Sequence, residues 1–438
     1  MNASAFDNLP RLSREECFEI LNTPVNDLNR SSDYYKAIFH LSKYPGIKTE
    51  DLLLKFLKNS SNRQEITLAK RKAIEVLVQL ECNRAIPEIA YCLDSKDHYL
   101  VEKAAWALKE LCCQDLLIHK KLADLLRESN QNTRVLIQSL GKLGSKLGLN
   151  EIKKFVNDSS TPPGILGASI ASLNANFGEE EHLYRLEKLL FLPNQNDRQC
   201  AIQDVIDANA LNMLPSVLIS PVAPYFRLRA VTSLWNQKHE SLDGLNFISI
   251  IDSIIKDDPC KFKLLHTYEI NTDNEFLINE FFHPDFSRSY LALKTLLSRR
   301  LDQVWPVISN CIDAIKKDYG AIYFLALLFK FKNKWPVSAI DEIKSFSYFC
   351  LEKHWPDFIK FKPISILNIS KYDRNGFLDL VDKLLDEKKT DFWLLRYSTL
   401  LALEGMTKKL DSHSLDYYIS IVRSDSNRIV REKVSNLK

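Results

Sequence analysis

Aromatic rings, cationic groups and isolated carboxylates recur at equivalent positions along a series of helical segments. The aromatic residues are Tyr35, Trp106, Tyr290 and Tyr319, the cations are Arg134 and Arg227, and the carboxylates are Glu102 and Asp318; one amide, Gln138, belongs to the same set. Aromatic rings stack on flat conjugated molecules, and arginine binds carboxylates through paired hydrogen bonds. Together these residue types predict a site for a flat, conjugated ligand that carries acid groups.

These positions follow from a helix pattern that is duplicated in residues 97–143. The segments DHYLVEKAAWALKEL and NTRVLIQSLGKL each have a polar lead-in, then a small or aliphatic residue, a Leu four places later and another Leu three beyond that. Residues at i, i+4 and i+7 share one face of a helix, so both helices are expected to bury the same stripe. We call the first residue of the stripe the anchor; it is Ala104 in the first copy and Leu136 in the second.

Equivalent anchors recur at steps of 29 to 36 residues. The clear ones are Ala37, Ala73, Ala104, Leu136, Ser169, Ala201 and Ala230, and weaker copies follow at Ala292, Ala321 and Thr399. A near-constant step that holds one pair of helices is typical of an α-solenoid. The sequence therefore predicts an all-α fold, a curved right-handed solenoid of helix pairs with a concave ligand groove.

In such a solenoid the second helix of each pair lines the concave face. The residues two before and two after each anchor point away from the first helix, which selects Tyr35/Phe39, Arg71/Glu75, Glu102/Trp106, Arg134/Gln138, Gly167/Ala171, Gln199/Gln203, Leu228/Thr232, Tyr290/Lys294 and Tyr319/Tyr323. Arg227 and Asp318 stand one position earlier on their helices. For each residue a structural role is the alternative: an aromatic ring could pack between repeats, Arg134 could form a surface ion pair, and Asp318 could stabilise a helix N-terminus.

Three regions are expected along the chain. Residues 1–30 should cap the first repeat, because Ser13-Arg-Glu-Glu16 matches a capping box before a short helix. Residues 31–240 hold the clear repeats, and residues 241–438 hold degenerate helical repeats that continue the same solenoid.

The composition argues against several classes of protein. The 59 Lys and Arg against 56 Asp and Glu leave a net charge of +3, too balanced for a nucleic-acid scaffold. The nine cysteines include no CxxC pair and no spacing with His that suits zinc, so no metal site is expected. No run of apolar residues is long enough for a membrane span, and the N-terminus has no apolar signal core, so we expect a soluble cytoplasmic protein. The sequence also holds no GxSxG, no phosphate-binding Gly loop, no HExxH and no Rossmann fingerprint.

Four segments carry a resemblance to a known family. DYYKAIFHLSKYP, HYLVEKAAWALKEL, NTRVLIQSLGKL and SPVAPYFRLRAVTSLW resemble the HEAT-like repeats of the E/F-type phycobilin lyases of cyanobacteria, most closely the single-chain phycoerythrin lyases and lyase-isomerases. The similarity is best over residues 1–240 and weaker to the end. It implies an enzyme that binds phycoerythrobilin, a linear tetrapyrrole, and attaches it through a thioether to a cysteine of a phycobiliprotein, with phycourobilin as the product of some relatives.

The resemblance gives each candidate residue a role. The rings of Tyr35, Trp106, Tyr290 and Tyr319 would stack on the bilin, and Arg134 and Arg227 would bind its propionates. Gln138 would also contact the bilin. Asp318, or as a second candidate Glu102, would deliver a proton to the tetrapyrrole as the acceptor thiolate attacks. The acceptor is expected to be the phycoerythrin α subunit. The enzyme is expected to need no cofactor, since phycoerythrobilin is its substrate. The chain is expected to be a monomer or weak homodimer.

Two other functions remain open at this point. A non-catalytic scaffold would use the concave surface to hold a partner protein and would bind no pigment. A chaperone for phycobilisome assembly or degradation could bind a bilin without forming a bond to it.

Overall fold

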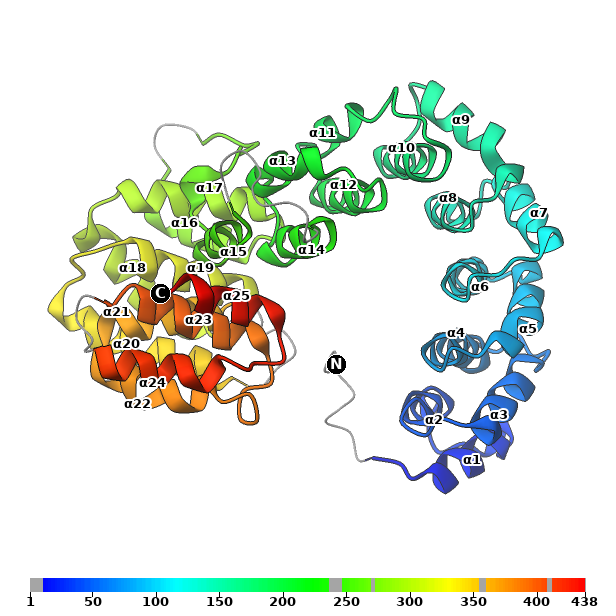
Figure 1. The fold of residues 1–438 in the computed structure, drawn as a ribbon, viewed down its shortest axis with the longest axis horizontal. Helices are drawn as coiled ribbons and strands as arrows, with labels where there is room; N and C mark the ends of the chain where they lie inside the picture. Colours follow the sequence, from blue (N-terminus) through cyan, green and yellow to red (C-terminus); the bar gives the residue numbers. More distant parts are fainter. Residues whose placement is uncertain (1–10, 236–245, 269–271, 354–359, 408–411, 438) are drawn as a thin grey trace. The chain divides into compact units, whose positions relative to one another are not determined.

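The computed structural model describes residues 11–235, 246–268, 272–353, 360–407 and 412–437. Every regular element in these ranges is a helix, and consecutive helices pair and stack in chain order, so the predicted all-α solenoid is confirmed (Figure 1). The chain divides into two compact units. The N-terminal unit consists of Phe6–Leu186 with Asp207–Asn209, and the C-terminal unit includes Glu187–Ile206 and Ala210–Lys438. The boundary expected at residue 240 lies outside the described residues.

The N-terminal unit has two layers of helices (Figure 1). Its helices are α1 (Arg14–Asn22), α2 (Asp33–Leu41), α3 (Ile47–Leu57), α4 (Gln64–Gln79), α5 (Ile86–Tyr91), α6 (His98–Glu110), α7 (Leu116–Leu125), α8 (Thr133–Lys142), α9 (Leu149–Asn157) and α10 (Pro163–Phe177). Each odd-numbered helix packs against the even-numbered helix that follows it, and the even-numbered helices contact one another in order. The predicted capping box is present at the start of α1, where Ser13 and Glu16 bond to each other's backbone.

The anchors are the points at which the second helices are buried. Ala37, Ala73 and Ala104 have no exposed surface, and Leu136 has 1%. A small side chain at this point lets the neighbouring helices approach closely. The polar lead-ins cap their helices, because the Asp97 carboxylate accepts a hydrogen bond from the first turn of α6 and the Asn132 side chain does the same for α8.

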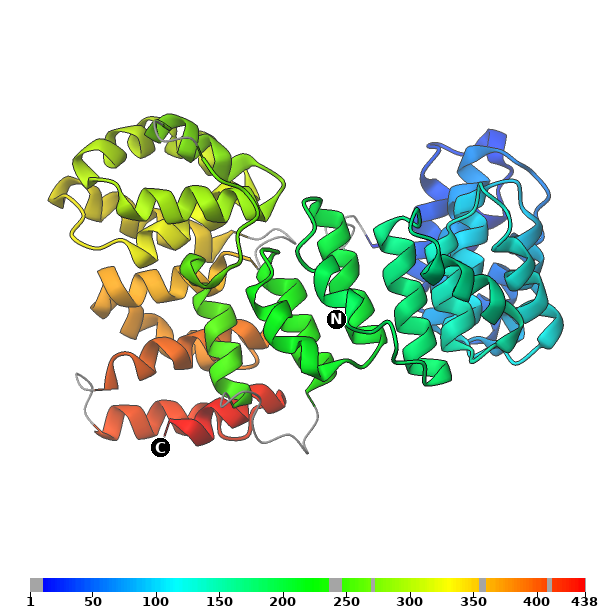
Figure 2. The ribbon, with the colours of Figure 1, turned by 90° about the horizontal axis from the view of Figure 1, so that it is seen from above.

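The C-terminal unit continues the pairing. Beyond α11 (Arg185–Leu189) and α12 (Gln195–Asp207), which lie at the division between the units, its helices are α13 (Leu214–Ile219), α14 (Pro224–Leu234), α15 (Phe247–Lys256), α16 (Asn274–Asn279), α17 (Phe286–Ser298), α18 (Leu301–Ile315), α19 (Tyr319–Phe331), α20 (Val337–Glu352), α21 (Lys362–Tyr372), α22 (Arg374–Leu385), α23 (Trp393–Glu404), α24 (Ser412–Val422) and α25 (Arg428–Asn436). Helices α17, α19, α21, α23 and α25 contact one another in order and form a stack that follows the sequence (Figure 2).

Helix α15 closes this stack, because it contacts both α21 and α25. The contacts of α15 with α23 and α25 are polar. The Tyr397 hydroxyl donates to Asp252 Oδ1 at 2.7 Å, and the buried Lys433 ammonium lies 2.8 Å from both Asp252 Oδ2 and Glu404 Oε2. Residues more than 140 positions apart in the sequence are thereby held together. Helices α15, α21, α23 and α25 of this closed arrangement also contribute residues to the wall of one pocket.

Within the described ranges, no helix combines the length and the apolar character that crossing a membrane requires.

Candidate functional site

Five of the predicted site residues lie on neighbouring second helices of the N-terminal unit. Tyr35 is on α2, Glu102 and Trp106 are on α6, and Arg134 and Gln138 are on α8. All five side chains are half-buried, two positions from a fully buried anchor. Because α2, α4, α6 and α8 contact in that order, these residues belong to one surface of the unit, which we call the inner face.

Helix α4 fills the middle of the inner face with an ion network. Lys72 Nζ lies 2.9 Å from Glu75 Oε2, and Lys103 Nζ lies 2.6 Å from Glu75 Oε1. The two ammonium groups also face aromatic rings, Lys72 at 5.7 Å from the ring centre of Tyr35 and Lys103 at 4.9 Å from that of Trp106. The inner face thus alternates ring, cation, carboxylate, cation and ring across three helices.

The electrostatics of this network keep its central carboxylate charged. Burial acts to raise the pKa of Glu75, but the hydrogen bonds from Lys103 and Lys72 outweigh it, so the pKa lies below its usual value. A carboxylate held in this way does not act as a proton donor. Glu75 is therefore better suited to fixing the two lysines than to acid catalysis.

Lys72 and Lys103 were not among the predicted site residues. Each stands immediately before an anchor, at the positions preceding Ala73 and Ala104. Lys36 holds the same position before Ala37. This recurrence was visible in the sequence, but the selection by two-residue offsets from the anchor passed over it.

The remaining inner-face residues differ in how far they are engaged. Arg134 Nη1 donates to the Gly164 carbonyl at 2.5 Å, and Gln138 Nε2 lies 3.1 Å from a carboxylate oxygen of Asp207. Glu102 makes no hydrogen bond or ion pair with any residue that the structure describes. It is the inner-face carboxylate whose oxygens remain open to a ligand, and it lies one helical turn from Trp106.

Arg227 and Tyr290 lie in the interior of the C-terminal unit, with 2% and 0% of their surfaces exposed. Arg227 Nη2 lies 2.6 Å from Asp257 Oδ1, and the Tyr290 hydroxyl donates to Asp257 Oδ2 at 2.6 Å. Arg227 also donates to the Tyr290 oxygen at 3.1 Å, and the Tyr323 hydroxyl donates to Asp257. The prediction that Arg227 and Tyr290 stand on an open groove is therefore wrong, because both are committed to a buried network.

Arg227 is buried because it occupies a second recurring position, three residues before the anchor. Arg198 and Arg396 hold the same position on α12 and α23, and both are as buried as Arg227. Arg198 pairs with Asp285, and Arg396 Nε lies 2.6 Å from Asp425 Oδ2. All three arginines also donate to loop carbonyls, so this position ties repeats to one another rather than facing a ligand.

Asp318 and Tyr319 lie at the start of α19. The Asp318 carboxylate accepts a hydrogen bond from the Ala321 amide at 2.8 Å, which is the helix-end role considered as its alternative. The Tyr319 ring faces the Lys353 ammonium at 5.1 Å. Both side chains are half-buried, and their roles toward a bilin stay predictions. The structure thus brings together the five inner-face residues in one unit, and Arg227 with Tyr290 in the other.

Lys330 lies close to the buried network, and its ammonium donates to the Lys256 carbonyl. Desolvation lowers the pKa of Lys330 from 10.5 to about 7. Between these pH values the unfolded chain binds a proton that the folded chain does not, so the contribution of Lys330 to the free energy of unfolding should rise from pH 7 to pH 10.

We expect Lys330→Met to be most stabilising, relative to the parent, at pH 7 and progressively less so at higher pH, measured by urea unfolding. Lys388→Met, at an exposed position, is the control. A difference between Lys330→Met and the parent that is the same at pH 7 and pH 10 would contradict this expectation.

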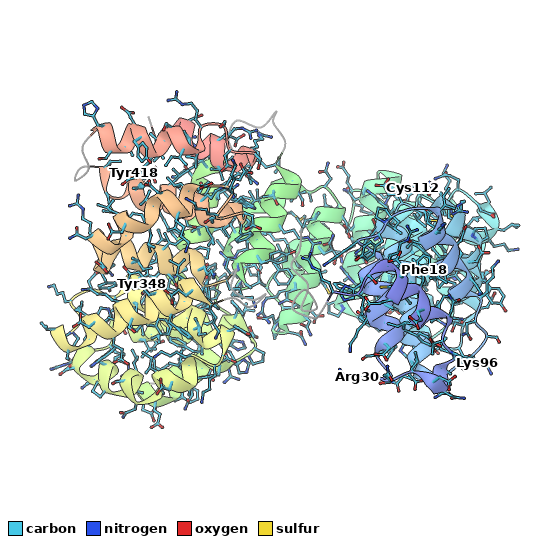
Figure 3. All side chains as sticks on the ribbon, turned by 90° about the horizontal axis from the view of Figure 1, so that it is seen from below. Phe18, Arg30, Lys96, Cys112, Tyr348 and Tyr418 are labelled. Atoms are coloured by element: carbon cyan, nitrogen blue, oxygen red, sulfur yellow. The ribbon has the colours of Figure 1, made fainter. Side chains whose placement is uncertain are left out.

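The cysteines offer few candidates for a covalent adduct. Burial raises the pKa of Cys17 to about 11 and that of Cys350 to about 12, so both remain neutral thiols near pH 7. Cys112, labelled on the N-terminal unit in Figure 3, and Cys260 are the exposed ones. In the described ranges, no three or more His, Cys, Asp or Glu side chains are grouped so that they could hold a metal ion.

No family model matches the chain. It is 35% identical over 386 residues to the bilin biosynthesis protein CpeY of Synechococcus sp. (strain WH8020), covering 87% of this chain and 91% of that protein. It is 28% identical over 432 residues to the uncharacterized phycocyanin operon protein Y of Pseudanabaena tenuis (strain PCC 7409), covering 96% and 97%. Among solved structures, the complex of CpcE and CpcF of phycocyanin lyase from Nostoc sp. PCC7120 aligns with a TM-score of 0.48 and 22% identity, over 58% of this chain and 98% of that one.

The similarity to CpeY extends over most of both chains. It agrees with the family that the four repeat segments resemble. The chain belongs to the E/F-type phycobilin lyase family.

Proposed function

We propose that this protein is a bilin lyase that attaches phycoerythrobilin through a thioether bond to a cysteine of the phycoerythrin α subunit. The observation that carries the proposal is the inner face of the N-terminal unit. There, aromatic rings and cations lie on adjacent helices beside Glu102, a carboxylate with no hydrogen bond or ion pair to the described residues. Its similarity to a protein named for bilin biosynthesis supports the ligand class.

The inner face supplies the contacts that a linear tetrapyrrole needs. Its pyrrole rings would stack on Tyr35 and Trp106, and its two propionates would bind Arg134 and the neighbouring lysine Lys103. Gln138 would donate or accept at the edge of the ring system. Holding the bilin on a rigid helical layer would fix the orientation of its ethylidene group toward the acceptor protein.

The attachment step adds a thiol across a carbon–carbon double bond. The acceptor cysteine, as a thiolate, forms the carbon–sulfur bond at the ethylidene group, and the electron pair of the double bond takes up a proton on the tetrapyrrole. Glu102 is our candidate for delivering that proton, because it lies one helical turn from Trp106 and has no hydrogen bond or ion pair with the described residues. If the same acid removed and returned a proton at a neighbouring carbon, the product would be phycourobilin.

The test is co-expression of the chain with phycoerythrobilin-producing enzymes and a phycoerythrin α subunit, followed by an absorbance spectrum of the acid-denatured subunit. A phycoerythrobilin spectrum that survives denaturation supports the lyase, and a blue-shifted phycourobilin spectrum supports a lyase-isomerase. Pigment that separates from the protein on denaturation would identify a bilin-carrying chaperone instead. No pigment on any subunit would leave a binding scaffold.

A further inference from the structure

The C-terminal unit contains a pocket of about 460 Å³ that the proposed function does not use. Its walls come from α14, α15, α19, α21, α23 and α25, all within that unit. The volume lies in the range of pockets that enclose small-molecule ligands. The wall is largely apolar and aromatic, with Tyr225, Phe392 and Trp393 among its residues.

Two cations, Arg229 and Lys360, interrupt this apolar wall, and none of the described residues that line it carries a carboxylate. Within the described part of the chain the Arg229 guanidinium has no ion pair or hydrogen bond, and the one contact of the Lys360 ammonium is with the Phe286 ring at 5.9 Å. Cations beside apolar walls, with no acidic partner among the residues that line the pocket, favour a ligand that brings its own negative charge.

The pocket is built from the same repeat positions as the inner face. Leu228 and Thr232 stand two before and two after the anchor Ala230, as Glu102 and Trp106 do around Ala104. Arg229 stands immediately before its anchor, as Lys103 does. The repeat position that supplies rings and cations to the inner face therefore supplies the wall of this pocket as well.

Tyr323 connects the pocket to the buried network. It contributes to the wall, yet only 1% of its surface is exposed, and its hydroxyl donates to Asp257 in the interior. The pocket therefore meets the ring rather than the hydroxyl of this tyrosine. The buried network has a positioning role here, since it holds the ring at the wall.

We propose that this pocket binds the free linear tetrapyrrole, with the ring system against Tyr225, Phe392 and Trp393 and the propionates at Arg229 and Lys360. This inference rests on the proposed function for the identity of the ligand. It assigns the C-terminal unit a bilin-binding site of its own, separate from the inner face.

The experiment titrates the purified full-length chain with phycoerythrobilin and follows the absorbance change of the pigment. Thr232→Trp places a large ring into the pocket from an exposed position, and Ser233→Trp places the same ring at the exposed neighbouring position outside the lining set. Because the inner face is also proposed to bind the bilin, the readout is the number of bilins bound per chain. We expect the parent chain and Ser233→Trp to bind two and Thr232→Trp to bind one, with circular dichroism confirming that both variants fold.

A second arm tests the charge. The dimethyl ester of phycoerythrobilin, which lacks both carboxylates, should bind about tenfold or more weakly than the free acid, and Arg229→Gln should reduce that preference. If the parent chain binds the bilin but both tryptophan variants bind it equally well, the pocket assignment is overturned while the lyase proposal stands. If the parent chain binds no phycoerythrobilin at all, both the pocket assignment and the proposed function fail.

Discussion

Replacing Glu102 with glutamine is expected to slow bilin attachment by about 100-fold to 10,000-fold, the range that a positioned general acid supplies. Glutamine preserves the size and the hydrogen-bonding capacity of the side chain but has no acid proton to deliver. Because Glu102 has no hydrogen bond or ion pair with the described residues, its replacement breaks no such interaction with them. The affinity for free phycoerythrobilin should therefore stay close to that of the parent, and the loss should appear in the rate of covalent attachment.

The matched control is Asp124→Asn, an acid-to-amide change on the outer helix α7, where the carboxylate pairs with Arg127 at 3.3 Å. Its attachment rate should equal that of the parent. Equal rates for Glu102→Gln and the parent would remove Glu102 from the chemistry. The decisive readout is the pigment bound covalently to the acceptor subunit at early times, when the rate limits the yield.

The second large effect is on stability. Asp257→Asn should lower the free energy of unfolding of the C-terminal unit by about 3–5 kcal/mol, the cost of removing one partner from a buried ion pair. The change leaves the Arg227 guanidinium buried without a counter-charge and weakens the acceptor for the hydroxyls of Tyr290 and Tyr323. Burial already raises the pKa of both tyrosines well above the usual value, so neither hydroxyl can replace the lost charge near pH 7.

Asparagine is the appropriate replacement because Asp257 has a positive φ of 49°, a conformation that asparagine tolerates better than most residues. Urea unfolding followed by tryptophan fluorescence measures the effect. Asp302→Asn is the control, since its pair with Arg300 is exposed on both sides and should contribute little. A loss for Asp257→Asn no larger than for Asp302→Asn would contradict the view that this network holds the unit together.

The solenoid could be predicted from the sequence because the spacing of buried residues is visible within each repeat by itself. The anchors Ala37, Ala73, Ala104 and Leu136 are all buried where the pattern required a close helix contact. The closure of the C-terminal unit could not be predicted in this way. It depends on contacts such as that of Tyr397 with Asp252, between helices far apart in the sequence, which no local pattern encodes.

The candidate site was predictable only in part, for a similar reason. An offset from the anchor finds the side of the helix on which a residue lies, and this placed Glu102 and Trp106 on the inner face. The offset cannot tell an open face from one that another repeat covers. It therefore also selected Tyr290, whose hydroxyl is hydrogen-bonded to Asp257 and Arg227 in the interior. A buried arginine and a ligand-binding arginine look the same in sequence until the acidic partner is located.

The central claim is that this chain forms the thioether bond, and reconstitution from purified parts tests it most directly. The chain, free phycoerythrobilin and a phycoerythrin α subunit are mixed, with a second α subunit in which serine replaces the acceptor cysteine. Covalent pigment is then measured after acid denaturation. We predict rapid attachment that requires both the chain and the acceptor cysteine. Attachment at the same rate without the chain, or none in its presence, would contradict the claim.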